Sequence, residues 1–214
     1  MNILIGSLAA LGYDFAVIFG VGLLKMKKVL SLEDSRKVIH ILLCFTWTIL
    51  HHFMAGSWGI LIVPVIFIAV NAASYKFHLL KMIEREGEDN HKGTIYFAVS
   101  MTLLLACATL LPQTLPLSGL GVFCLTLGDG FAAVVGQKVK SPTIVGSKTL
   151  AGTAACFVFS LLGMVLTNFM VPTGLAFWKL LILALVSAGA ELVGNRMDNF
   201  SVPLLVYAAA IFLS

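Results

Sequence analysis

The sequence predicts an all-α protein, a polytopic integral membrane helix bundle with about eight transmembrane helices. The chain of 214 residues is 59% hydrophobic and only 11% charged, with a mean hydropathy of +1.01. Soluble domains carry about 25% charged residues, so lipid rather than water is expected to cover much of this surface. The apolar stretches are continuous rather than alternating, which disfavours strands, and most reach the ~20 residues that a helix needs to cross a bilayer.

Eight apolar stretches follow one another within a single predicted domain, residues 1–214. They cover residues 2–24, 38–55, 57–75, 94–112, 115–137, 150–171, 175–194 and 200–213. Short turn-forming sequences follow the second, fourth and sixth stretches, namely Ala55-Gly56-Ser57, Pro112-Gln113-Thr114 and Val171-Pro172-Thr173-Gly174. Longer polar segments follow the first, third and fifth. The last stretch is the shortest, so seven spans, with this segment re-entrant or strongly tilted, remain an alternative.

The positions of Lys and Arg predict how the helices are oriented. Thirteen of the fourteen basic residues lie after the first, third, fifth or seventh stretch, and only Lys179 lies on the opposite side. Because basic residues concentrate in cytoplasmic loops, we expect these loops at about 25–37, 76–93, 138–149 and 194–200. Both termini are then expected outside, on the other face of the membrane.

The composition also argues against several classes of protein. The net charge of +4 includes no basic tract interleaved with aromatic residues, so nucleic acid is not an expected partner. The four cysteines lie in different apolar stretches without metal-binding or redox spacing. We therefore interpret them as small buried side chains.

Several groups of polar residues gather at the predicted cytoplasmic ends of the helices. In the first group, Arg36, Lys37 and His40 begin the second stretch, and His40 lies one helical turn beyond Arg36 on the same face. This group suits the binding of phosphate or of a polar headgroup. The simpler alternative is a basic flank that anchors the helix end among lipid headgroups.

A second group surrounds Asp129, whose carboxylate would cost roughly 2.5–3.5 kcal/mol if it lay unpaired near the bilayer centre. Gly128 beside it allows a ligand to approach the backbone closely. The loop that follows contains Ser147-Lys148-Thr149 and leads to Gly152. A lysine, hydroxyls and free N–H groups at a helix start suit phosphate oxygens, although the full Walker spacing is absent. Capping of the helix by the hydroxyls is the alternative.

A third group lies near the C-terminus. Glu191 is expected within the seventh helix, and Asp198 and Asn199 in the loop after it. Two carboxylates and an amide near a membrane face can hold a divalent cation that bridges phosphates. The alternative is that Asp198 or Asn199 caps the last helix.

Two further polar features stand apart. The mixed charges from Glu84 to Lys92 are interpreted as a solvated loop, and Gly93-Thr94, directly after them, are candidates for the border of the site. Asp14 lies in the middle of the first span, where we expect it to face the bundle interior with a polar partner rather than to act in catalysis.

Taken in this order, the motifs resemble those of the CTP-dependent lipid-alcohol kinases. This family includes dolichol kinase, phytol kinase and CTP-dependent diacylglycerol kinase, and it resembles the phosphatidate cytidylyltransferases. The resemblance spans about residues 33–210. The matching residues are Arg36-Lys37 with His40, Gly93-Thr94 with Tyr96-Phe97, Gly128-Asp129 with Ala132 and Gly136, Ser147-Lys148-Thr149 with Gly152-Thr153, and Glu191 with Asp198-Asn199 and Val202-Pro203-Leu204. Two positions depart from the family pattern, because Ala151 stands in place of Glu and Gln137 in place of a basic residue.

The resemblance implies transfer of the γ-phosphate of CTP to the hydroxyl of a membrane lipid, with Mg²⁺ as the cofactor. It implies catalytic roles for Asp129, Glu191 and Asp198, with Glu191 a candidate base, and metal binding by Asp129, Asp198 and Asn199. The residues expected to bind the nucleotide or its phosphates are Arg36, Lys37, His40, Gly128, Ser147, Lys148, Thr149 and Gly152. CTP would arrive from the cytosol, and an isoprenoid alcohol or diacylglycerol from the inner leaflet.

Two other functions remain open. A phosphatidate cytidylyltransferase would use the same nucleotide and metal, but it would attack the α-phosphate and release pyrophosphate. A non-enzymatic transporter would also carry polar residues in its membrane helices, although this chain has no internal repeat and its polar groups gather at one face. A CDP-alcohol phosphotransferase is disfavoured, because the later aspartates that its Asp-Gly motif requires are missing after Asp129-Gly130.

Overall fold

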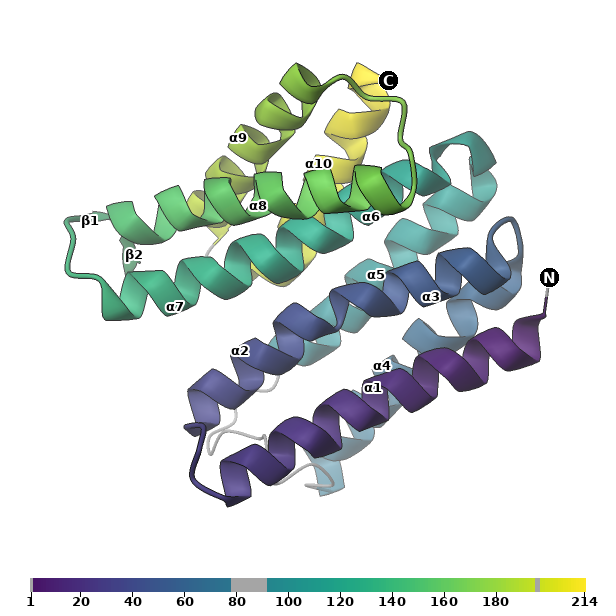
Figure 1. Ribbon diagram of the computed structural model, residues 1–214, viewed down its shortest axis with the longest axis horizontal. Coiled ribbons are helices and arrows are strands. Elements are labelled where there is room, and N and C mark those ends of the chain that lie inside the picture. The colour runs from purple at the N-terminus through teal and green to yellow at the C-terminus, as the bar shows by residue number, and fades with distance from the viewer. Residues whose placement is uncertain (1, 78–91, 195–196) are drawn as a thin grey trace.

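Helices make up nearly all of the chain that the structure describes. The computed structural model describes residues 2–77, 92–194 and 197–214 (Figure 1). The α-helices are α1 (Ile3–Met26), α2 (Leu32–Leu42), α3 (Cys44–Met54), α4 (Ile62–Phe77), α5 (Lys92–Leu110), α6 (Leu115–Phe123), α7 (Gly130–Lys138), α8 (Leu150–Met170), α9 (Phe177–Gly194) and α10 (Asp198–Leu213). Short 3₁₀ turns, η1 (Trp58–Leu61) and η3 (Pro112–Thr114), precede α4 and α6. Strands β1 (Thr143–Val145) and β2 (Lys148–Thr149) pair as an antiparallel hairpin.

The eight predicted apolar stretches correspond to eight helical segments. Among the described residues, six segments are long and apolar enough to cross a membrane, namely Ile3–Met26, Leu32–Met54, Gly93–Leu110, Pro112–Lys138, Leu150–Met170 and Phe177–Gly194. Trp58–Ser74 and Asp198–Leu213 are apolar but shorter. The predicted fold class, an all-α polytopic membrane bundle, is confirmed. The shortness of the last segment is also confirmed.

Successive segments run back and forth between two ends of the bundle. The hairpin and the turn between α1 and α2 lie at one end, at the left of Figure 1, while the N-terminus and the turns after α3 and α5 lie toward the other. Most of the predicted loop 76–93, with its charged residues from Glu84, lies outside the described residues, as do Asn195 and Arg196. The assignment of the hairpin end to the cytoplasm stays a prediction.

The second segment begins earlier than the sequence analysis placed it. Ser31 is the N-cap of α2, and its hydroxyl accepts a 3.0 Å hydrogen bond from the backbone N–H of Asp34. Acidic residues in the first turn, Glu33 and Asp34, favour a helix start because they face the positive end of its dipole. The expected loop 25–37 is therefore partly helical, and Arg36 and Lys37 project from α2 rather than from a loop.

The fifth segment contains a π-helical turn, Cys124–Asp129, between α6 and α7. Such a turn inserts an extra residue into the helical repeat, often at functional sites. Helix α6 before it is the centre of the core, and all of its residues except Pro116 are buried. The indole N–H of Trp47 in α3 donates a 2.8 Å hydrogen bond to Ser118 in α6. A Cβ on Gly121 would lie 2.6 Å from the carbonyl oxygen of Pro203, so this glycine allows α10 to contact α6.

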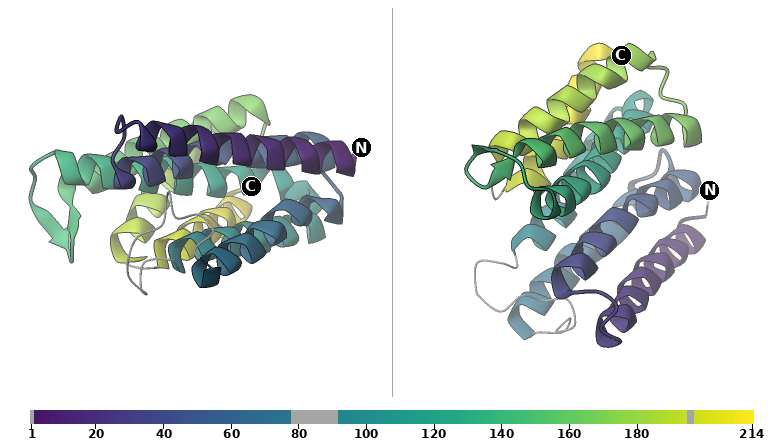
Figure 2. Two further views of the ribbon diagram at one scale, coloured as in Figure 1. Left: turned by 90° about the horizontal axis from the view of Figure 1, so that it is seen from below. Right: turned by 60° about the vertical axis from the view of Figure 1, so that its left-hand side comes forward.

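The helices form two groups, which the right-hand view of Figure 2 separates clearly. The first group is α1 to α4, and the second is α6 to α10, while α5 contacts members of both. The groups meet where α2 packs on α7 and on the π turn, and where α3 packs on α6. The geometry of the candidate site depends on this junction, because α2 carries some of its polar residues and the second group carries the rest.

Candidate active site

Three buried carboxylates from distant parts of the sequence meet near the hairpin end of the bundle. Asp129 ends the π turn, Glu191 lies in the last turn of α9, and Asp198 begins α10. One carboxylate oxygen of each lies within 4.8 Å of the other two. Met197, rather than Asp198 or Asn199, occupies the N-cap position of α10, so the alternative of a capping role receives no support. The arrangement offers the oxygen ligands that Mg²⁺ and Ca²⁺ prefer.

Lys148 lies between two of these carboxylates. It projects from β2, and its ammonium donates hydrogen bonds to Glu191 and, over 2.6 Å, to Asp198. Burial by itself would lower the pKa of Lys148, but the hydrogen bonds to Asp198 and Glu191 outweigh it and raise the pKa above its usual value. The lysine therefore remains charged at neutral pH.

The two carboxylates keep one oxygen each that Lys148 does not use. Glu191 Oε2 and Asp198 Oδ1 are buried and have no hydrogen-bond partner within the described part of the chain. A buried acceptor without a partner costs about 1–3 kcal/mol, and more when it is charged. These two atoms are therefore suited to a ligand with positive charge.

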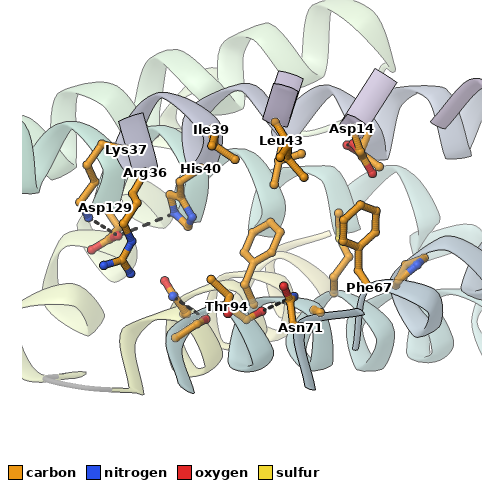
Figure 3. Close-up of a pocket in the computed structure, with 18 of the residues that line it drawn as sticks. Asp14, Arg36, Lys37, Ile39, His40, Leu43, Phe67, Asn71, Thr94 and Asp129 are labelled. Atoms are coloured by element: carbon orange, nitrogen blue, oxygen red, sulfur yellow. Dashed lines mark hydrogen bonds and ion pairs between the residues drawn. The ribbon is translucent and has the colours of Figure 1, made fainter. Parts of the chain in front are cut away.

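Asp129 connects the carboxylate cluster to basic residues of α2. Its Oδ2 lies 3.5 Å from Lys37 Nζ and 3.7 Å from His40 Nε2. Dashed lines mark both contacts in Figure 3. The pairing supplies the partner that a carboxylate within an apolar stretch requires. The neighbouring Arg36 forms a 3.7 Å ion pair with Glu33. The first two predicted groups of polar residues are thus brought together.

A cavity of about 240 Å³ opens beside Asp129. Its polar end is lined by Glu33, Arg36, Lys37, His40, Asp129 and Asn199. The rest of the cavity is mostly apolar. Its apolar lining residues are Ile18, Ile39, Leu43, Val63, Pro64, Phe67, Phe97, Ala98 and Met101. The polar residues among them are Asp14 of α1, Thr46 of α3 and Asn71 of α4. Neither Glu191 nor Lys148 is among the lining residues. The cavity therefore suits an amphiphilic molecule with its polar end at Asp129.

Asn199 faces the cavity rather than the carboxylate cluster. Its side-chain amide donates a 2.9 Å hydrogen bond to the backbone carbonyl of Gly93. Its backbone carbonyl accepts a 2.7 Å hydrogen bond from the hydroxyl of Ser100. These bonds fasten the start of α10 to α5. In the cluster, Glu191 stands where the sequence analysis expected Asn199, and the predicted metal binding by Asn199 stays a prediction.

The residues of the predicted phosphate loop, Ser147, Thr149 and Gly152, have different roles in the structure. Thr149 caps α8 by accepting a 3.2 Å hydrogen bond from the N–H of Gly152, which supports the capping alternative for this hydroxyl. Ser147 is exposed at the turn of the hairpin, directly after Gly146 with its positive φ of 54°. A Cβ on Gly152 would lie 3.0 Å from the carbonyl of Ala132, so Gly152 allows α7 and α8 to touch.

Gly128 has a packing role that the sequence analysis did not foresee. A Cβ at this position would overlap the hydroxyl of Ser160 in α8, so the glycine allows the π turn to lie directly on that helix. Ser160 in turn contacts Ser187 of α9 over 2.9 Å. The backbone that presents Asp129 is therefore fixed from behind by two helices.

The cavity contains residues that the sequence analysis did not select. The amide of Asn71 in α4 donates a 3.2 Å hydrogen bond to the carbonyl of Thr94 in α5, and both residues line the cavity. The ring of Phe97 lies edge-on to His40, with the ring centroids 5.3 Å apart. A polar residue within an apolar stretch was a signal that could have identified Asn71. Gly93 and Thr94 do border the site, as expected.

Taken together, the fold and the site define an integral membrane protein with a charged cluster beside an amphiphilic cavity. Comparison with known proteins gives a more particular relationship. The chain is 26% identical over 228 residues to phytol kinase 1, chloroplastic, of Arabidopsis thaliana, which covers 95% of this chain and 74% of that protein. It is 28% identical over 207 residues to the phytol kinase of Synechocystis sp., which covers 90% and 84%. It is 31% identical over 130 residues to a dolichol kinase of Schizosaccharomyces pombe, which covers 55% of this chain and 25% of that protein.

No family model matches the chain, and no solved structure gives a significant match. The similarity to the phytol kinases nevertheless extends over most of the sequence. It confirms the resemblance that the motifs indicate, and the chain is related to the lipid-alcohol kinase family.

Proposed function

We propose that this protein is a membrane kinase that transfers the γ-phosphate of CTP to the hydroxyl of a lipid alcohol, with an isoprenoid alcohol such as phytol or a polyprenol as the preferred acceptor. One observation carries the proposal. Asp129 belongs both to the buried carboxylate cluster and to the wall of the amphiphilic cavity. A phosphoryl donor at the cluster and an alcohol in the cavity would therefore meet at this residue.

The cavity supplies the acceptor side of the proposed reaction. The hydroxyl would lie near Asp129 and His40, and the hydrocarbon tail would follow the apolar wall past Leu43 and Phe97. Asp129, which lines the cavity, would accept the hydroxyl proton. Glu191, the base considered from the sequence, does not line the cavity and is hydrogen-bonded to Lys148. As the proton leaves, the acceptor oxygen bonds to the γ-phosphorus, the bond to the β,γ-bridging oxygen breaks, and CDP leaves with the electron pair.

Basic residues on both sides of Asp129 suit the donor. Phosphoryl transfer depends chiefly on positioning and on neutralising the charge of the phosphate oxygens. Lys37 and Arg36 on α2 and Lys148 on the hairpin would supply positive charge from two directions. Ser147 and the N-terminal end of α8 lie on the same hairpin connection and would contact phosphate oxygens.

The cluster also fits a Mg²⁺ ion. Asp129, Glu191 and Asp198 would hold it, because Glu191 Oε2 and Asp198 Oδ1 are buried oxygens with no partner among the described residues. When bound, the ion would neutralise charge on the β- and γ-phosphates. With Lys148 already paired to two of the carboxylates, the chain itself holds them in position for this role.

The orientation completes the proposal. The hairpin end would face the cytoplasm, because basic residues concentrate there, and both termini would lie outside. CTP would then reach the cluster from the cytosol, and the alcohol would enter laterally from the inner leaflet. Diacylglycerol is a second candidate acceptor.

The test uses purified protein with Mg²⁺ and CTP that carries its label at either the α- or the γ-phosphate. Phytol, a polyprenol, diacylglycerol and phosphatidic acid serve as separate acceptors. We expect γ-label, and no α-label, in the isoprenoid alcohols. Label from the α-phosphate in phosphatidic acid would establish a cytidylyltransferase instead. If neither label reaches any lipid, uptake into proteoliposomes without nucleotide tests the transporter.

A further inference from the structure

The cavity is too small to enclose the isoprenoid alcohols that the proposed function names. If a carbon atom with its hydrogens takes up about as much space as a water molecule, about 30 Å³, a cavity of about 240 Å³ holds a chain of about eight carbon atoms. Geraniol, with two isoprenoid units, is close to this size, whereas phytol has twice as many units and a polyprenol has more. The far part of a phytol or polyprenol tail must therefore lie outside the cavity.

A row of aromatic rings begins at the end of the cavity away from Asp129. Figure 3 places Phe67 of α4 at that end, across from Asp14 of α1. The ring centroids of Phe67 and Phe15 in α1 are 6.2 Å apart, and Phe15 packs on Phe19 over the same distance. The side chains of Phe15 and Phe19 are 38% and 58% exposed, and neither lines the cavity. The row therefore runs from the cavity wall to the apolar surface of the bundle.

These rings lie between α1 and α4, and we call this boundary the α1–α4 seam. Helix α1 packs chiefly on α2 and α3, and α4 packs chiefly on α5, so α1 and α4 contact each other only sparsely. Other sides of the cavity are closed more firmly. Helix α2 packs on α7, and the hydrogen bond from Asn71 to the carbonyl of Thr94 ties α4 to α5. The α1–α4 seam is thus the side of the cavity that parts most readily.

We propose that the tail of the lipid acceptor passes between Phe15 and Phe67, through the α1–α4 seam, into the surrounding lipid. The inference rests on the proposed function, because the hydroxyl of the same acceptor lies at Asp129. Phe15 lies midway along α1, so the tail emerges near the centre of the bilayer, where the tails of inner-leaflet lipids end. A path deeper into the bundle is disfavoured, because it would press hydrocarbon against the carboxylate of Asp14, which accepts a hydrogen bond from Thr46.

The seam has a consequence for the choice of acceptor. The part of a tail beyond Phe15 lies in lipid and meets no protein, so alcohols longer than the cavity should bind with similar affinity whatever their length. An enclosed cavity would instead select alcohols of one length. The seam therefore accounts for a site that takes both phytol and a polyprenol.

The experiment closes the seam with a covalent bridge between α1 and α4. Phe15→Cys and Phe67→Cys are combined with Cys107→Ser, because Cys107 is the exposed one of the native cysteines. A short bifunctional maleimide then links the two new thiols. The matched control combines Phe15→Cys with Phe19→Cys in the same background. Its two rings are also 6.2 Å apart, but they belong to one helix, so this bridge leaves the α1–α4 seam free to open.

Binding is measured at equilibrium without nucleotide, as the shift in thermal unfolding that geraniol or phytol causes. The bridge between α1 and α4 should weaken phytol binding about tenfold or more, because the extra methylenes have no space in a closed site, and it should leave geraniol binding unchanged. The bridged control should bind both alcohols as it does before bridging. Unchanged phytol binding, an equal loss of both alcohols, or the same loss of phytol binding in the bridged control would overturn the proposal.

The same proteins, supplied with CTP and Mg²⁺, separate this inference from the proposed function. If the unbridged protein phosphorylates neither alcohol, the kinase proposal fails, whereas a selective loss of phytol binding on bridging still supports passage of the tail through the seam. If both alcohols are phosphorylated and bridging α1 to α4 changes neither rate, the kinase proposal stands and the seam is rejected.

Discussion

The contact of Lys148 with two buried carboxylates leads to a prediction about stability. In Lys148→Met, Glu191 and Asp198 lose their counter-charge, while their exposed side-chain fractions of only 4% and 11% leave little access to water. Removing one partner of a buried ion pair costs about 3–5 kcal/mol. Because Lys148 itself is 23% exposed, we expect the lower limit, about 3 kcal/mol. For a chain of this size that corresponds to a fall in Tm of roughly 6–12 °C.

The measurement is thermal unfolding of purified protein in detergent with EDTA. Lys140→Met, which removes an exposed lysine near the same hairpin, is the control and should leave Tm within about 2 °C of the wild type. Combining Lys148→Met with Glu191→Gln should recover part of the loss, because one uncompensated charge disappears. Addition of Mg²⁺ should also stabilise Lys148→Met more than the wild type. A Tm for Lys148→Met equal to that of Lys140→Met would refute the pairing.

Three further predictions follow from the site. Asp129→Asn should lower turnover by roughly a thousandfold in a protein that still folds, and retained turnover would remove Asp129 from the mechanism. Gly128→Ala should destabilise the protein by about 1–3 kcal/mol, because its Cβ overlaps the hydroxyl of Ser160. Adding Ser160→Ala should restore part of that loss. The control Gly189→Ala, whose Cβ has open space around it, should be neutral or stabilising. The pKa of Lys148 is raised, so its contribution to the stability of the wild-type protein is complete below its ordinary value of 10.5 and is lost only as the pH rises above that value. The loss of wild-type Tm that deprotonation of Lys148 causes should therefore appear only in strongly alkaline buffers, and its appearance in neutral buffers would contradict the pairing.

The sequence predicts the helical segments well because lipid imposes a strong and simple constraint on each of them. A spanning helix needs a long apolar stretch, and the eight stretches recognised in the sequence reappear as eight helical segments. The start of α2 was misplaced because hydropathy marks where a chain enters lipid, whereas Ser31 marks where the helix begins. The predicted partner of Asp14 was also found, because a buried carboxylate needs one wherever it lies.

The site was predicted in composition but not in arrangement. The residue types identified Asp129 as a candidate because a carboxylate in a membrane segment is costly, and Glu191 and Asp198 because carboxylates near a membrane face can hold a divalent cation. Their arrangement depends on the packing of α2 on α7 and of α10 on the π turn, and no periodicity of the sequence records it. The apolar wall of the cavity was missed for a related reason. Its residues look like any other lipid-facing or core positions.

The π turn between α6 and α7 explains how Asp129 can serve both the donor side and the acceptor side of the proposed reaction. A regular helix through residues 115–138 would turn residue 129 by a different angle, because the π turn adds one residue to the repeat. With the π turn in place, Asp129 lies within reach of the carboxylates of α9 and α10 and also of Lys37 and His40 on α2. Gly128 removes the side chain that would push this turn away from α8. The position of Asp129 thus depends on the backbone around it as much as on the carboxylate itself, which is why a Gly-Asp pair in an otherwise apolar stretch is an informative signal.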